Sequence, residues 1–171
     1  MNQEKENLTK QYIFQAFNQL LKTTNYDNIS VCDITKKAGV SRMSFYRNFK
    51  SKEDLAYKGI QLVFDKIHKR LEESEEKSQY ICAKIVFEEF MPAKDLLQSF
   101  KNSNLAASMI DIIEKKLKED VPNDYMNKTS KYIPVFYFGA IASTLLCWLN
   151  NGAEETPDEM AKLIATHMIG V

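Results

Sequence analysis

Residues 42–47 carry side chains that are suited to reading DNA bases. Arginine can donate two hydrogen bonds to one guanine, serine can bond to the edge of any base, and an apolar side chain can contact the thymine methyl group. The sequence supplies these groups in succession as Arg42, Met43 and Ser44, followed by Tyr46 and Arg47. We therefore predict contacts between this segment and base edges in the major groove.

Lysine and tyrosine side chains around this segment are suited to binding phosphate. Lys36 precedes the segment, and Lys50 and Lys52 follow it. We predict that these lysines and the hydroxyl of Tyr46 contact the DNA backbone, where contacts fix the register of a protein without reading sequence. Lys52 also lies near the start of a predicted helix, whose free backbone amides favour an anion.

A short predicted helix from Val31 to Ala38 begins and ends at residues with capping chemistry. Ser30 and Asp33 have the spacing of a capping box, with aspartate in place of glutamate. Gly39 follows the helix, at the position where a left-handed backbone conformation ends a helix without steric penalty. The sequence therefore predicts a helix that is closed by a tight turn.

The next helix is predicted to start directly after this turn, with Ser41 as its N-cap. Phe45 and Phe49 are four residues apart and so form its inward-facing pair. Two short helices joined by such a turn have the length and turn chemistry of a helix-turn-helix, which we place at 30–49. The first turn of the second helix then faces outward.

Helical periodicity continues along the rest of the chain, and no segment shows the alternation of a strand. The stripes, caps and breaks predict further helices over 8–23, 51–71, 80–91, from Pro92 onward, over 105–117, 132–149 and 156–168, with a junction at 72–79 and a loop at 121–128. Only five glycines and four prolines occur in 171 residues, whereas turn-rich β-folds use more of both. We therefore predict an all-α protein.

The distribution of charge also points to the first third of the chain. The whole sequence has 23 basic and 23 acidic residues, which cancel. Residues 1–55 contain nine Lys and Arg against six Asp and Glu, whereas residues 56–171 contain 14 against 17. A face that binds nucleic acid is therefore expected in the N-terminal third.

The cysteines indicate the cellular compartment. Cys32, Cys82 and Cys147 are odd in number and far apart, which disfavours a disulfide framework and a zinc site. Met1 is followed by polar residues rather than by an apolar segment, so we expect no secretory signal. We expect a cytoplasmic protein.

Residues 132–149 form an apolar segment of 18 residues without a charge, the lower limit for a transmembrane helix. Pro134, Ser143 and Thr144, and the lack of a following basic cluster, favour a buried helix instead. We predict that 132–149 and 156–168 form an antiparallel pair that meets its two-fold copy in a four-helix interface. The expected interface residues are Leu145, Trp148 and Leu149.

An effector site is expected beside the helix that starts near Ser51, because a ligand shifts DNA binding only through its different affinities for two conformations. The helices between residues 80 and 117 contain several Phe and Met side chains, enough to line a modest apolar cavity. The candidate residues are Phe87, Phe90 and Met109. We expect an apolar or aromatic small effector, with a protein partner or no effector as alternatives.

Two stretches, Asp33–Ser41 (DITKKAGVS) and Phe45–Leu55 (FYRNFKSKEDL), resemble the DNA-binding domain of the TetR family of bacterial transcriptional regulators. The resemblance implies an all-helical homodimer with a helix-turn-helix domain over 1–52 and an effector and dimerisation domain over 53–171. Family positions that commonly touch DNA correspond to Arg42, Met43, Ser44, Tyr46, Arg47 and Lys52, to which we add the cap Ser41. Met43 stands where the family frequently has glycine.

The C-terminal run from Tyr137 to Ala161 is similar to a shorter TetR subgroup that includes activators of dihydroxyacetone kinase operons. This similarity places a protein effector, or none, among the alternatives to a small molecule.

These features predict a cytoplasmic, sequence-specific DNA-binding protein that represses transcription. It would bind a palindromic operator as a homodimer, associate with the nucleoid in that state, and be released by a small apolar effector. The alternative is a helical interaction module or membrane-tethered adaptor in which the helix-turn-helix is only structural. The basic residues of the third helix favour DNA over this alternative and over a membrane partner.

No sequence motif of an enzyme is found. A glycine-rich phosphate loop, H-E-x-x-H and G-x-S-x-G are all missing from the sequence. His68 and His167 are the two histidines and lie far apart. We therefore expect no catalysis, no cofactor and no metal site.

Overall fold

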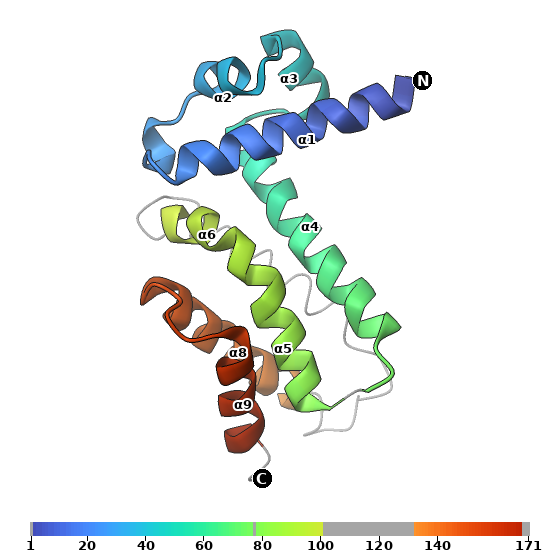
Figure 1. The fold of residues 1–171 in the computed structure, drawn as a ribbon, viewed down its shortest axis with the longest axis vertical. Coiled ribbons are helices and arrows are strands. Elements are labelled where there is room, and N and C mark those ends of the chain that lie inside the picture. The colour runs from blue at the N-terminus through green and yellow to red at the C-terminus, as the bar shows by residue number, and fades with distance from the viewer. Residues whose placement is uncertain (1, 77, 101–131, 169–171) are drawn as a thin grey trace. The chain divides into compact units, whose positions relative to one another are not determined.

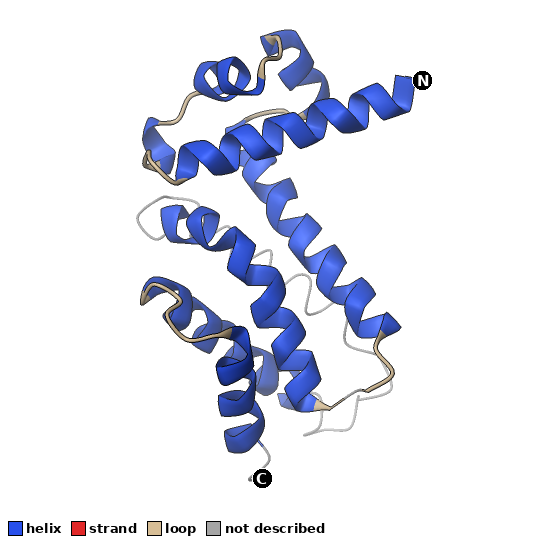
Figure 2. Ribbon diagram, in the orientation of Figure 1, coloured by secondary structure: helices blue, strands red, loops and turns tan. Residues whose placement is uncertain are grey.

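The computed structural model describes residues 2–76, 78–100 and 132–168, and every regular element in these ranges is helical (Figures 1 and 2). The elements are α1 (Asn2–Leu21), η1 (Tyr26–Asn28), α2 (Val31–Ala38), α3 (Arg42–Asn48), α4 (Lys52–Glu73), α5 (Gln79–Phe90), η2 (Met91–Ala93), α6 (Lys94–Phe100), α8 (Ile133–Asn150) and α9 (Pro157–Met168). The predicted all-α class is confirmed. The helix predicted over 105–117 and the loop over 121–128 lie outside the described residues.

The chain forms two compact units. Unit 1 contains Met1–Phe64 and Asp95–Leu105, and unit 2 contains Asp65–Lys94 and Ala106–Val171. Helix α4 contributes residues to both units. The functional division predicted between residues 52 and 53 remains a prediction.

Unit 1 has an apolar core to which α1 contributes one face. Ile13 and Phe17 are buried, at the i, i+4 spacing that places them on one stripe. Phe14 meets Phe49 edge to face, with ring centroids 5.3 Å apart. Helix α1 begins at Asn2, earlier than predicted, because its polar first turns contain no helix breaker although they add nothing to the apolar stripe.

Helix α6 adds to the same core. A Cβ atom placed on Gly59 of α4 would lie 3.4 Å from Phe14 Cε1 and 3.5 Å from Leu96 Cδ2. Leu96 belongs to α6 and is buried. Side chains of α1 and α6 therefore pack over this glycine of α4.

In unit 2, α5 packs against α9. Ala83 and Phe87 on α5 and Ala161 on α9 are buried. Phe87 meets Trp148 of α8 edge to face, with ring centroids 5.2 Å apart. The indole N–H of Trp148 donates to the carbonyl oxygen of Glu155 at 3.0 Å. Trp148 thus joins α8 to α5 and to the segment before α9.

The apolar segment predicted over 132–149 is helical from Ile133 to Asn150. Gly152, in the following turn, has a φ of 93°, and Thr156 Oγ1 then accepts a hydrogen bond from the N–H of Glu159 at 3.2 Å. Thr156 therefore caps α9, which lies in the helix predicted over 156–168. Among the residues described, none of the helices combines the length and the apolar character needed to cross a membrane.

Candidate nucleic-acid interface

Helix α2 is capped at both ends, which fixes its length. Ser30 Oγ accepts a hydrogen bond from the N–H of Asp33 at 3.2 Å, and Asp33 Oδ2 accepts one from the N–H of Ser30 at 3.0 Å. The Ser30 hydroxyl also donates to Asp33 Oδ2 at 2.6 Å, and this hydrogen bond, followed by the one from the Ser30 N–H, lowers the pKa of Asp33 below its ordinary value. Gly39 ends the helix with a φ of 67°, and the N–H of Val40 donates to the carbonyl of Thr35 at 3.0 Å. The predicted capping box and left-handed turn are both confirmed.

Helix α3 is fixed by its N-cap and by two buried rings. Ser41 Oγ accepts a hydrogen bond from the N–H of Ser44 at 3.0 Å. Phe45 and Phe49 are buried with ring centroids 5.6 Å apart, which confirms the predicted inward pair. The cap and the rings together determine which side of α3 faces solvent.

The solvent-facing side of α3 carries four of the predicted DNA contacts. Arg42, Met43, Tyr46 and Arg47 are all exposed. The exposed fraction is 66% for Met43 and 50% for Tyr46, which are high values for large apolar or aromatic side chains. The structure thus brings these four residues together on one short helix, labelled α3 in Figure 1.

The two serines of α3 are engaged with each other. The hydroxyl groups of Ser41 and Ser44 lie 2.9 Å apart, and Ser44 is half-buried. The side-chain amide of Asn48 donates to the carbonyl of Ser44 at 2.7 Å. Both hydroxyls therefore shape the start of α3, and their contact with DNA remains a prediction.

The three predicted phosphate-binding lysines differ in their surroundings. Lys36 and Lys50 are exposed, and the backbone N–H of Lys50 is held by Asp54 Oδ2 at 2.8 Å. Lys52 is half-buried, and its ammonium group donates to the carbonyl of Tyr26 at 2.8 Å. Lys52 is therefore bound to another part of unit 1 in this structure.

The sequence interpretation missed two residues of this region. Tyr26 lies in η1, a segment whose sequence indicated only a break between helices, and its side chain is buried. A single aromatic residue inside the polar run Asn25–Asn28 is the signal that could have revealed it. Lys37 is exposed beside Lys36 in the last turn of α2 and adds positive charge there.

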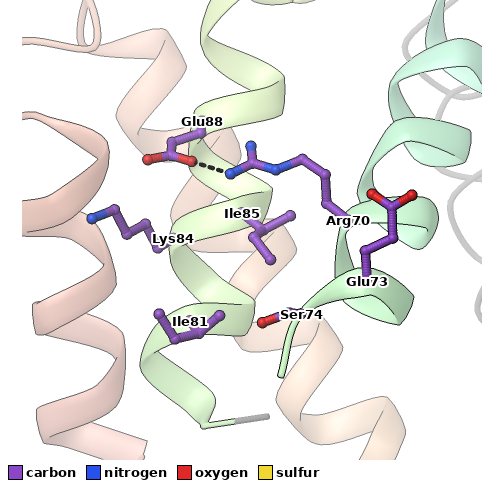
Figure 3. A pocket seen from close by; sticks show the side chains of 7 residues that line it. All are labelled: Arg70, Glu73, Ser74, Ile81, Lys84, Ile85 and Glu88. Carbon is purple, nitrogen blue, oxygen red and sulfur yellow. Dashed lines mark hydrogen bonds and ion pairs between the residues drawn. The ribbon is translucent and has the colours of Figure 1, made fainter. Parts of the chain in front are cut away.

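The predicted effector residues do not line a pocket that lies between α4 and α5 in unit 2. Phe87 and Phe90 are buried core residues, and Met109 lies outside the described residues. The pocket has a volume of about 360 Å³ (Figure 3). Its lining consists of Arg70, Glu73, Ser74, Ile81, Lys84, Ile85 and Glu88. Five of these seven residues are charged or polar, and none is aromatic.

Charged side chains that line this pocket form ion pairs with other residues of the chain. Arg70 on α4 donates to Glu88 at 2.6 Å, as Figure 3 shows, and to Glu89 at 2.8 Å. The hydrogen bonds to Glu88 and Glu89 raise the pKa of Arg70 above its ordinary value. Lys84 pairs with Asp158 of α9 at 3.1 Å. A ligand here would compete with these pairs, so the pocket offers little to an apolar effector.

The three predicted interface residues lie inside the chain itself. The exposed fractions of Leu145, Trp148 and Leu149 are 6%, 3% and 1%. Side chains that are already buried have almost no surface left to bury against a partner, so this part of the prediction is corrected. Phe136, at 65%, and Leu146 remain exposed on the same helix.

Within the described ranges, no group of three His, Cys, Asp or Glu side chains is arranged to hold a metal ion. The three cysteines are free thiols, and Cys32 and Cys147 are exposed.

Two family models match the chain. One is described as bacterial regulatory proteins of the tetR family and matches residues 13–57. The other is described as a transcriptional regulator C-terminal region and matches residues 88–170. The first match contains the whole of α2 and α3, with their caps and the exposed face.

The chain is also similar in sequence to an individual transcriptional regulator. The chain is 36% identical over 55 residues to the HTH-type dhaKLM operon transcriptional activator DhaS of Lactococcus lactis subsp. lactis (strain IL1403). That alignment covers 32% of this chain and 29% of the relative, so it spans less than a third of the relative's length.

Solved structures extend the similarity over nearly the whole chain. The dihydroxyacetone kinase operon activator DhaS matches over 94% of both chains, with a TM-score of 0.68 and 16% identity. The regulator FadR from Bacillus subtilis, in complex with stearoyl-CoA, matches over 94% of this chain and 97% of its own, with a TM-score of 0.59 and 19% identity. These structures share the fold. With the helix-turn-helix and the C-terminal region both matched, the chain belongs to the TetR family of bacterial transcriptional regulators.

Proposed function

We propose that this chain is a repressor that binds a palindromic DNA operator as a homodimer. The main support is the exposed side of α3, where Arg42, Met43, Tyr46 and Arg47 share one surface while Phe45 anchors the helix in the core. These groups suit the major groove, and a rigidly held helix can present them without a large ordering cost. Membership of the TetR family supports DNA binding as the function.

We propose two kinds of DNA contact for this surface, contacts to bases and contacts to phosphates. Arg42 lies in the first turn of α3 and is proposed to donate to a guanine, and Met43 to contact a thymine methyl group. Lys36 and Lys50 are exposed before and after α3, and they are proposed to bind phosphates together with the hydroxyl of Tyr46. Phosphate contacts supply much of the affinity and its salt dependence, whereas base contacts supply sequence preference.

A second copy of the chain is the proposed partner of one side of α8. Phe136, Gly139, Ser143 and Leu146 are all exposed and follow helical spacings of three and four. We call these four residues the α8 face. A side chain on Gly139 would meet no atom within 4 Å. Two small residues between two apolar ones allow two copies of α8 to approach closely and to bury Phe136 and Leu146.

A two-fold dimer explains why the operator is expected to be palindromic. Each copy presents one α3, and the two helices enter major grooves about 34 Å apart, or a multiple of this distance, on one side of the duplex. The DNA half-sites then mirror the symmetry of the protein.

A small apolar effector is proposed to release the operator. The FadR structure supports this class, because a protein of the same fold is in complex with stearoyl-CoA. Such a ligand acts only if it binds one conformation better than the other. A protein effector, or none, remains the alternative.

Activation of transcription is the second candidate for the direction of regulation, since the Lactococcus lactis relative is an operon activator.

Selection of duplexes from a random-sequence pool by the purified protein tests the proposal. The expected result is an enriched sequence with two-fold symmetry. A reporter gene placed behind that sequence then separates repression from activation, because expression of the protein lowers the signal in one case and raises it in the other. Failure to enrich any sequence, even at low salt, would contradict DNA recognition. Thermal-shift screening against hydrophobic compounds, followed by operator release, tests the effector.

A further inference from the structure

The C-terminal end of α3 is bound by a side chain of α4. Helix α3 contains seven residues, and a helix this short is not stable without contacts to the rest of the protein. Its last residue is Asn48, whose carbonyl oxygen accepts a hydrogen bond from Lys58 Nζ at 3.1 Å. A cation at this end of a helix also interacts favourably with the helix dipole. Lys58 therefore stabilises the end of α3 that lies opposite the Ser41 cap.

Asp54 holds Lys58 in this position. It lies one turn before Lys58 on α4, and its Oδ2 atom accepts from Lys58 Nζ at 3.0 Å. The same oxygen accepts from the backbone N–H of Lys50 at 2.8 Å, in the turn between α3 and α4. Burial opposes the ionisation of Asp54, but the hydrogen bonds from Lys50 and Lys58 outweigh it, so the pKa of Asp54 lies below its ordinary value. The carboxylate is therefore charged where it meets the ammonium group.

Lys58 also contacts the apolar core of unit 1. Its ammonium group lies 5.3 Å from the centre of the Phe49 ring, which is buried against Phe14 of α1 and Phe45 of α3. The Lys58 side chain is 41% exposed, so a carbonyl oxygen, a carboxylate and an aromatic face replace part of its water. We use the name α3 anchor for Asp54 and Lys58 together with the Asn48 carbonyl and the Phe49 ring.

We propose that Lys58 is a positioning residue for DNA recognition, which fixes the C-terminal end of α3 on α4 and so sets the orientation of the exposed side of α3. The inference rests on the proposed DNA-binding function and adds a residue that is not among the predicted DNA contacts. Arg47 directly precedes Asn48, so a displacement of this end of α3 also moves Arg47. Hydrogen bonds to bases tolerate only a few tenths of an ångström of displacement, which makes binding sensitive to the anchor.

Binding to two duplexes separates positioning from phosphate contact. The variants are Lys58→Met, the conservative Lys58→Arg and the matched control Lys66→Met, which removes an exposed lysine from the part of α4 that belongs to unit 2. One probe is a duplex that the wild-type protein selects from a random-sequence pool, and the other is an unrelated duplex of the same length.

Lys58→Met should weaken binding to the selected duplex about fivefold, because a loosened α3 must be ordered when it binds. Binding to the unrelated duplex should change by less than about twofold, since it depends on phosphate contacts. Lys58→Arg should restore most of the affinity for the selected duplex, because a guanidinium group also donates to both a carbonyl and a carboxylate. The control Lys66→Met should bind both duplexes as the wild-type protein does.

Amide hydrogen exchange of the full chain tests the anchor without DNA. The N–H of Phe49 donates to the carbonyl of Phe45 at 2.9 Å at the end of α3. In Lys58→Met this N–H should exchange about fivefold faster, because the end of α3 opens more often. The N–H of Val40, which donates to the carbonyl of Thr35 at 3.0 Å at the end of α2, should exchange at the wild-type rate.

The outcomes are distinct. Equal weakening of both duplexes by Lys58→Met would indicate a phosphate contact and overturn the inference, and so would unchanged binding to the selected duplex. Unchanged exchange at Phe49, or equally faster exchange at Phe49 and Val40, would overturn it as well, since the second result is a general loss of stability. Failure of the wild-type protein to bind any duplex would overturn the proposed function, and exchange at Phe49 would still decide whether Lys58 anchors α3.

Discussion

The hydroxyl of Tyr80 on α5 donates a hydrogen bond to the carboxylate of Asp158 in the first turn of α9. The same carboxylate pairs with Lys84 at 3.1 Å and with Lys162 at 2.8 Å. Hydrogen bonds from Lys162, then Tyr80 and Lys84, hold the pKa of Asp158 far below its ordinary range. One carboxylate thus links two helices that are distant in the sequence.

Asp158→Asn should lower the melting temperature at neutral pH, and this effect should become smaller in acid. Because the pKa of Asp158 is lower in the folded than in the unfolded state, its contribution is fully present above the unfolded pKa of about 4. The contribution is lost as the pH falls through the folded pKa. In thermal unfolding of wild type and variant from about pH 8 down to about pH 3, the difference should be constant above about pH 5 and begin to decrease below the unfolded pKa of about 4. Glu154→Gln is the control, and a pH-independent difference for Asp158→Asn would contradict the assignment.

Gly39→Ala should destabilise the protein by about 1 kcal/mol, because a φ of 67° is strained for a residue with a Cβ atom. No atom lies within 4 Å of the added Cβ, so the cost comes from the backbone conformation alone. Gly39→Asn is the matched control and should cost less, since asparagine tolerates this conformation better. Urea unfolding measures both variants, and equal costs would argue against backbone strain.

Arg42→Ala should relax sequence preference at one position of each half-site, at a cost of about 1 to 3 kcal/mol on the preferred sequence. Lys36→Ala should instead weaken binding to all sequences alike and lower the salt slope by about 0.9. Binding of both variants to the selected duplex and to its single-base variants, over a range of salt concentrations, measures these effects. The same sequence preference and the same salt slope for the two variants would show that the assigned roles are wrong.

Leu146→Glu should convert the proposed dimer into a monomer, because it places a charge in the α8 face. Leu62→Glu is the matched control, since Leu62 is also an exposed leucine on a helix but belongs to unit 1. Sedimentation of both variants should show a monomer for the first and a dimer for the second. A dimer that survives Leu146→Glu would place the interface elsewhere on the chain.

Helix ends were the most predictable part of the fold. The hydrogen bonds at Ser30, Ser41 and Thr156 join residues three apart, and the turn at Gly39 depends on the backbone freedom of one residue. Such features are encoded locally, so spacing and residue type suffice to place them. The exposed side of α3 follows from the same logic, once Phe45 is recognised as buried.

Contacts between distant segments could not be predicted from the sequence. Trp148 was expected at a subunit interface but packs on Phe87, because a helix that is apolar all round does not show which side faces its own chain. The hydrogen bond from Lys52 to the carbonyl of Tyr26, 26 residues earlier, is another contact that the sequence did not reveal. A lysine near a helix start has the same local signature whether or not a distant carbonyl accepts from it, and the predicted contact of Lys52 with DNA remains a prediction.

The packing of Leu96 over Gly59 affects the order in which the parts of unit 1 can fold during synthesis. Unit 1 consists of Met1–Phe64 and Asp95–Leu105, with residues of unit 2 between them in the sequence. Domains generally fold during synthesis in the order in which they leave the ribosome. Here α1 to α4 emerge before α6, so a nascent chain arrested within Asp65–Lys94 lacks the side chain that covers Gly59. Unit 1 is therefore completed only after translation has passed the middle of the chain.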